Sequence, residues 1–201
     1  MTLTKNAIIF IDGNNLYHNL KASFIRPGSI DLNKLVTVVA THFSCTVQKV
    51  IYYNSIPSIK DGSEIYYSHM KFLDEIKKYQ GFEIKTRKLQ RQSTREKMKT
   101  IEEEIFTQKL CAVCEPVVLS HWKDYIGKIN VKEKGIDILI AVDIFASCLL
   151  RKECDMCVLV TGDADFIPCM DIVKSKGMSI ATASTAKGYS YELRKEHSII
   201  S

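Results

Sequence analysis

Acidic and amide side chains follow two of the most apolar segments of the chain, at the points where those segments end. Asp12 and Asn15 come directly after the run 7–11, and Asp163 and Asp165 come directly after the run 157–161. A buried carboxylate without a partner is costly, so acids in such places usually have a cation or strong hydrogen-bond donors beside them. Carboxylate oxygens are ligands that suit Mg²⁺ and Mn²⁺. The pattern therefore favours a divalent-metal site.

The same acids have a simpler interpretation. An Asp after a strand is commonly a turn former or the N-cap of the next helix, and Asp163 and Asp165 stand just before a helix expected near Phe166. A third acid, Asp137, opens an apolar helical segment, and two acidic loops with a helical acid together shift the balance towards a metal.

The segments around these acids alternate between strand and helix. Strands are predicted at 7–11, 47–54, 82–87, 157–161 and 178–183, and helices at 15–23, 31–43, 64–79, 133–150 and 167–175, with a further helix from Thr94. This alternation predicts an α/β fold with a parallel sheet. Sites in such sheets form outside the carboxyl ends of the strands. If the strands 7–11 and 157–161 are neighbours, the acids that follow them meet on one rim.

Composition limits the remaining possibilities. The 201 residues fit one domain, in which we treat 88–130 as an insertion and expect 111–130 to be irregular. No apolar run approaches the roughly 20 residues of a membrane span, and the first residues lack a signal-peptide pattern. Seven cysteines then indicate reduced thiols in the cytoplasm, and a net charge of +5 permits a polyanionic partner.

A basic segment lies between residues 85 and 99. It contains Lys85, Arg87, Lys88, Arg91 and Arg95, with Glu96 as its one acid. Such a density of cations can neutralise phosphates, and we predict that this segment binds RNA, the alternative being a solvated charged face. Four tyrosines are candidates for stacking on unpaired bases, although core packing is the commoner role: Tyr17, Tyr52, Tyr53 and Tyr189.

Two CxxC pairs raise the question of zinc. Cys111 and Cys114 precede His121, and Cys154 and Cys157 form the second pair. A structural zinc site normally needs four well-placed ligands, so reduced thiols are the favoured interpretation.

Three stretches together resemble the NYN domain family, nucleases within the PIN-like superfamily, with the LabA-like subgroup closest. They are IIFIDGNN (8–15), KGIDILIAVD (134–143) and LVTGDADFIPCMDIVKSKG (159–177), and the tail 188–194 is similar to the last helix of the family. The resemblance implies a Rossmann-like αβα sandwich with a central parallel sheet and a metal-dependent phosphodiesterase site, usually acting on RNA. The implied site residues are Asp12, Asn15, Asp137, Asp163 and Asp165, with the four aspartates as metal ligands.

Supporting roles are expected for residues nearby. Asp143 lies about 120° around the helix from Asp137, so the two cannot face one site equally. We assign Asp137 to the metal and Asp143 to a supporting position, as a partner of the ligands or a buried acid bonded to a neighbouring loop. The resemblance suggests that Asn15 contacts the scissile phosphate or a metal-bound water. Thr161 lies near the same rim as a supporting hydroxyl or a simple strand-end residue.

The sequence thus predicts a metal-dependent ribonuclease that uses Mg²⁺ or Mn²⁺, acts on single-stranded RNA and needs no membrane. Three alternatives remain open. An acidic metal site could equally cleave DNA, because it does not itself recognise the 2′-hydroxyl. A non-catalytic RNA-binding regulator on a degenerate nuclease fold is a second. A phosphatase with Asp12 as nucleophile is a third, although no acid stands two residues later to act as general acid.

Overall fold

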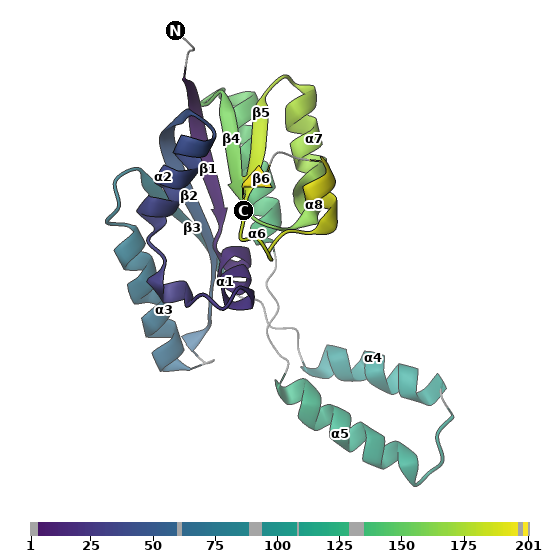
Figure 1. Ribbon diagram of the computed structural model, residues 1–201. Coiled ribbons are helices and arrows are strands. Elements are labelled where there is room, and N and C mark those ends of the chain that lie inside the picture. Colours follow the sequence, from purple (N-terminus) through teal and green to yellow (C-terminus); the bar gives the residue numbers. More distant parts are fainter. Residues whose placement is uncertain are drawn as a thin grey trace. The chain divides into compact units, whose positions relative to one another are not determined.

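The computed structural model describes residues 4–59, 62–88, 94–107, 109–128, 135–196 and 199–200 (Figure 1). Contacts divide the chain into two compact units, one formed by Met1–Arg87 with Gly135–Ser201 and the other by Lys88–Lys134. The prediction of a single domain interrupted at 88–130 stays a prediction. Within the described residues, no helix is both long and apolar enough to cross a membrane.

The first unit is built on a parallel sheet. Its strands are β1 (Lys5–Asp12), β2 (Cys45–Ile56), β3 (Phe82–Lys88), β4 (Met156–Val160), β5 (Ser179–Ala183) and β6 (Ile199–Ile200), in the order β3-β2-β1-β4-β5-β6. The pairings of β1 with β2 and β4, and of β5 with β4 and β6, are all parallel. The predicted α/β class is confirmed. β1 and β4 are neighbours, and the strand order reverses between them, which is where open sheets of this kind bind ligands.

Helices cover both faces of the sheet, as the αβα prediction requires (Figure 1). On one face lie α1 (Gly13–Ala22), α2 (Leu32–His42) and α3 (Ser63–Ile76), which pack on Ile9 and Ile11. On the other lie α6 (Ile136–Ile144), α7 (Ile167–Ser175) and α8 (Tyr191–Glu196), which pack on Ile8 and Phe10. Successive side chains of β1 therefore point into the two cores in turn, as expected for a strand that is covered on both faces.

One sequence-based expectation is wrong, and another is confirmed over the residues that the structure describes. Residues 111–130 are not irregular, because α5 (Cys114–Lys128) occupies most of them, with Pro116 in its first turn, where proline is tolerated. The helix expected at 133–150 is α6 followed by a π-helical segment (Phe145–Leu150), and residues 133 and 134 lie outside the described part of the chain. In the second unit α4 (Thr94–Thr107) begins at the expected residue and packs against α5.

Candidate functional site

Asp12 ends β1 and is almost fully buried, with 4% of its surface exposed. Its Oδ1 accepts the backbone N–H of Asn15 at 3.0 Å, so this oxygen caps α1. Its Oδ2 accepts the Thr161 hydroxyl at 3.4 Å. The simple interpretation as an N-cap therefore holds for one oxygen, and the other faces the end of β4.

Thr161 links the two strand ends. It is 1% exposed, and its Oγ1 donates to Asp12 and accepts the backbone N–H of Asp163 at 3.3 Å. One buried hydroxyl thus connects a carboxylate on β1 to the loop that carries the next acid. The supporting role predicted for Thr161 at a metal site stays a prediction.

Asp163 and Asp165 sit in the turn after β4. Asp163 is half-buried, and its Oδ1 accepts the backbone N–H of Asp165 at 3.0 Å, capping a 3₁₀ turn, η4 (Ala164–Phe166). Asp165 is exposed. The two acids therefore differ in position, Asp163 at the strand end and Asp165 on the surface beside it.

Asn15 fastens the loop after β4 to α1. Its Oδ1 accepts the Gly162 N–H at 2.9 Å and the Asn19 amide at 2.6 Å. Asn19, one turn along α1, also donates to Ser184 Oγ at 3.2 Å and to the Gly188 carbonyl at 3.3 Å. Sequence reasoning missed Asn19. Its spacing of four residues from Asn15, which puts both amides on one face of a helix, was the signal.

Two glycines permit the close packing of this edge. A Cβ on Gly13 would lie 2.5 Å from the Tyr52 hydroxyl and 2.6 Å from the Tyr53 carbonyl. A Cβ on Gly162 would overlap the carbonyl oxygen of Gly188. The residues directly after Asp12 and directly before Asp163 are thus fixed as glycine by the backbone and side chains beside them.

Asp137 lies in the first turn of α6 and is exposed. Asp143 lies further along α6, where its Oδ2 accepts the Tyr53 hydroxyl at 2.8 Å and the Lys85 ammonium at 2.7 Å. Its partners come from strands β2 and β3, which corrects the expectation of a neighbouring loop. Lys85 is tied to this acid and, more loosely, to Glu83 at 3.7 Å.

The comparison with family models matches the NYN domain over residues 6–200. The chain belongs to the NYN domain family. The same fold occurs in the crystal structure of a protein of unknown function from Vibrio parahaemolyticus, with a TM-score of 0.57 and 14% identity, over 100% of this chain and 96% of that one. The comparison with curated proteins gave no match. The family has a nuclease-type fold, and the LabA-like subgroup stays a prediction.

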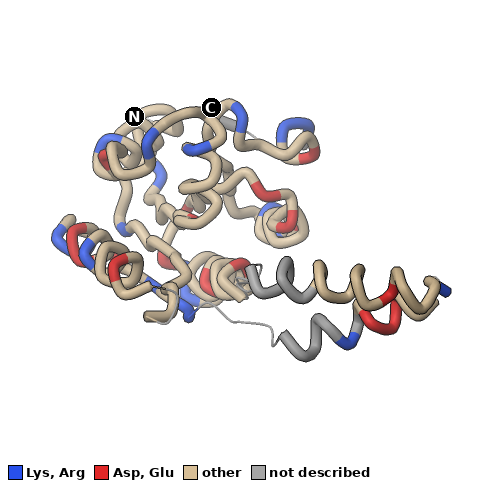
Figure 2. The backbone as a smooth tube through the Cα atoms, turned by 90° about the horizontal axis from the view of Figure 1, so that it is seen from below, with Lys and Arg blue, Asp and Glu red and all other residues tan. Residues whose placement is uncertain are grey.

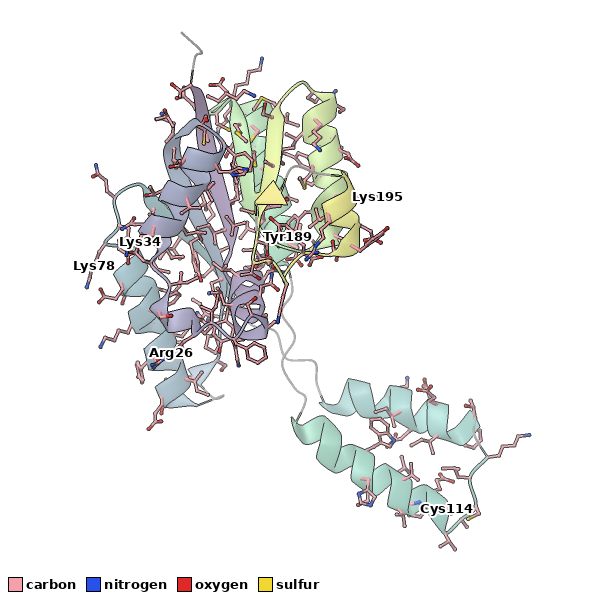
Figure 3. All side chains as sticks on the ribbon, viewed as in Figure 1. Arg26, Lys34, Lys78, Cys114, Tyr189 and Lys195 are labelled. Carbon is pink, nitrogen blue, oxygen red and sulfur yellow. The ribbon has the colours of Figure 1, made fainter. Side chains whose placement is uncertain are left out.

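The tyrosines of this NYN domain divide by burial. Tyr52, Tyr53 and Tyr189 are buried, whereas 46% of Tyr17 is exposed. Figure 3 shows Tyr189 beside the sheet, where its hydroxyl donates to the Thr182 carbonyl at 3.4 Å. Burial, offset by a hydrogen bond from Asn54 and reinforced by Asp12, raises the pKa of Tyr52 to about 12. Of these four candidates, Tyr17 is therefore the one placed to stack on a base.

The basic segment is described in part. Arg87 and Lys88 are exposed at the end of β3. Arg91 lies outside the described residues, and Arg95 belongs to α4, where its side chain is outside them. Figure 2, which views the chain from the side at which β1 ends, marks the Lys and Arg positions in blue and the acids in red.

The donor set of the NYN domain suits a hydrated metal. Within the described residues, no three His, Cys, Asp or Glu side chains are already gathered as a ligand group. Mg²⁺ commonly keeps several waters and takes only one or two carboxylates. Thr161 links the buried Asp12 carboxylate to the backbone N–H of Asp163, which places one acid beside the loop that carries another. The zinc alternative has less support, since the Sγ of Cys111 accepts the Cys114 N–H at 3.4 Å and both residues are exposed free thiols.

Proposed function

We propose that this NYN domain is a metal-dependent ribonuclease of the cytoplasm, in one domain interrupted by an insertion. Asp12 and Asp163 hold Mg²⁺ or Mn²⁺, and Asp137 and Asp165 act through metal-bound waters. The observation that carries the proposal is the buried Thr161 hydroxyl, which connects the Asp12 carboxylate to the Asp163 backbone. A buried acid at the reversal point of a parallel sheet gains more from a cation than from a cap alone.

Each residue has a defined task in the proposal. The metal, when bound, lowers the pKa of a water and stabilises charge on the phosphate oxygens. Asp12 and Asp163 hold it at the strand ends, and Thr161 keeps the two at a fixed separation. Asn15 has its amide oxygen engaged by Gly162 and Asn19, so its amide nitrogen is the atom that contacts the scissile phosphate or a water.

The test is the substitution Asp12→Asn. Asn is as good an N-cap as Asp, so the α1 cap should survive while the metal-binding charge is lost. We expect cleavage of labelled single-stranded RNA in Mn²⁺ or Mg²⁺ to fall by roughly 100-fold or more. Thermal unfolding in chelator should be unchanged or shifted upward, because the loss of one charge relieves repulsion among the acids.

Asp31→Asn is the matched control. Asp31 caps α2 by accepting the N–H groups of Asn33 at 2.9 Å and Lys34 at 3.2 Å, and it is exposed. Its substitution should leave cleavage unchanged. Parent-like cleavage by Asp12→Asn would refute the metal assignment. Single-stranded DNA in parallel tests the DNA alternative, and a parent protein that binds RNA but cleaves neither substrate would favour the non-catalytic regulator.

A further inference from the structure

The end of α1 holds an aromatic residue in a position that normally requires glycine. The Ile25 N–H donates to the Leu20 carbonyl at 2.9 Å, and the Phe24 N–H donates to the Lys21 carbonyl at 3.0 Å. These two bonds form a Schellman motif, whose central residue adopts the left-handed conformation and is usually glycine. Here that residue is Phe24, with φ at +59°.

Burial stabilises Phe24 very little in this conformation. Its side chain is 90% exposed, so it contributes no burial. The other described residues with positive φ, apart from glycines, are polar: Ser44, Lys109 and Lys152. A bulky residue held in this region is a genuine outlier, and such strain is concentrated at functional positions.

Phe24 belongs to a row of exposed aromatic and cationic side chains. Tyr17 and Lys21 lie one turn apart on α1, and Phe24 follows directly after the end of the helix. The Lys21 ammonium lies 5.4 Å from the centre of the Tyr17 ring, and the Lys187 ammonium lies 5.2 Å from the centre of the Phe24 ring. Two aromatic rings therefore each have a lysine beside them.

The two segments that carry this row contain cations and no acid. From Gly13 to Ile30 the sequence contains Lys21 and Arg26 but no acid, and from Ser184 to Ser190 it contains Lys187 but no acid. Figure 3 shows Arg26 on the segment that follows α1. The row therefore suits an anionic partner that also presents flat apolar faces.

The row is also attached to the candidate metal site. Asp12 caps the start of α1, whose 10 residues span about 15 Å. The loop with Lys187 is fixed to α1 by Asn19, and the hydroxyls of Ser23 and Thr185 lie 3.2 Å apart. A strand that lies along α1 would reach the acids at its beginning.

We propose that Tyr17, Lys21, Phe24 and Lys187 bind single-stranded nucleic acid, with bases stacked on the two rings and phosphates beside the two lysines. The proposed function enters this proposal at one point, which is that the bound strand is the substrate of the nuclease. Binding itself does not depend on cleavage. Unpaired bases stack on aromatic side chains with little dependence on sequence, whereas bases inside a duplex do not offer their faces.

The experiment measures binding of a labelled oligouridylate of about ten nucleotides in chelator, where no cleavage occurs. Phe24→Gly should weaken binding by roughly 5- to 100-fold, as expected for the loss of one stacked base. The same change should leave the melting temperature unchanged or raise it, because glycine relieves the left-handed backbone. A merely structural role would move both quantities downward together.

Two control variants separate the loss of the Phe24 ring from the change in backbone conformation and from the loss of any exposed aromatic side chain. Ser44→Gly makes the same backbone change at the end of α2, where φ is +49°, and should not alter binding. Tyr67→Ala removes another exposed aromatic, on α3, and should not alter binding either.

Unchanged oligouridylate affinity in Phe24→Gly would overturn the proposal. Equal weakening for duplex RNA would overturn it as a single-strand surface, as would a parent protein that does not bind the oligouridylate. Asp12→Asn distinguishes the two proposals. If that variant cleaves normally while Phe24→Gly binds weakly, the metal assignment fails and the binding surface stands.

Discussion

Single side chains at the rim carry two tasks at once. Asp12 uses Oδ1 to cap α1 and presents Oδ2 to Thr161, and Asn15 belongs to the same turn while its oxygen holds the Gly162 N–H. A substitution at such a residue can remove one of its two interactions and keep the other. Asn at position 12 keeps the cap and loses the charge, which is why it separates stability from chemistry.

Tyr53 gives the fold a dependence on alkaline pH. The buried phenol donates to Asp143 at 2.8 Å, and burial together with that carboxylate raises the pKa of Tyr53 far above its ordinary value of about 10. A raised pKa means that this stabilisation is fully present below pH about 10 and is lost as the pH rises further, because the unfolded chain releases a proton that the folded chain keeps.

We therefore expect Tyr53→Phe to flatten the alkaline decline in the free energy of unfolding by up to about 1.4 kcal/mol per pH unit. Near neutral pH it should cost roughly 0.5–1.5 kcal/mol for the lost hydrogen bond. Denaturant unfolding at a series of pH values measures both effects. Tyr67→Phe, at an exposed position, is the control, and an equal alkaline slope in Tyr53→Phe and the parent would contradict the assignment.

Among the elements, the loops after β4 and β5 depend on their glycines for contact. Gly162 and Gly188 bring the two backbones together, and the Ser190 N–H donates to the Gly162 carbonyl at 2.9 Å. We expect Gly162→Ala to lower the free energy of unfolding by roughly 1–3 kcal/mol, because the new methyl group must displace the backbone.

Gly28→Ala is the control for this change. A Cβ on Gly28 meets nothing within 4 Å, so its effect should stay within about 0.5 kcal/mol. Urea unfolding of the two variants tests the difference. Equal free energies of unfolding for the two variants would show that the loops after β4 and β5 can move apart without loss of stability.

Helices and strands were predictable from the sequence where neighbouring residues alone determine them. The apolar runs before Asp12 and Asp163 located β1 and β4 within two residues of their ends, because a strand covered on both faces is continuously apolar. α5 was missed, and Pro116 is compatible with it because it lies in the first turn of the helix. Asn19 was missed because its partner Gly188 is 169 residues away, and the pattern of one helix does not reveal so distant a partner.

At the scale of the whole chain, the unit formed by Met1–Arg87 with Gly135–Ser201 contains both hydrophobic cores. Its two pieces approach each other where the insertion leaves, since a Cβ on Gly135 would lie 2.8 Å from the Arg87 guanidinium. We expect a variant in which a short Gly/Ser linker replaces Lys88–Lys134 to unfold cooperatively within about 5 °C of the parent.

The same variant tests the basic segment. Loss of Lys88, Arg91 and Arg95 should reduce the salt dependence of RNA binding by a slope of about one per phosphate contact. Calorimetry and binding at several salt concentrations measure the two results. Non-cooperative unfolding would show that residues 88–134 are part of the core domain, and an unchanged salt slope would make the basic segment a solvated face.

The position of β1 between β2 and β4 also sets the order in which the protein matures on the ribosome. β1 can pair with β2 early in synthesis. Asp12 and Thr161 are 149 residues apart in sequence, so the other edge of β1 stays unpaired until β4 has been synthesised. At about 5–20 residues per second this takes roughly ten seconds or more. Throughout that interval the nascent chain holds only half of the acidic rim, so the proposed metal site stays incomplete until β4 and the loop after it have been synthesised.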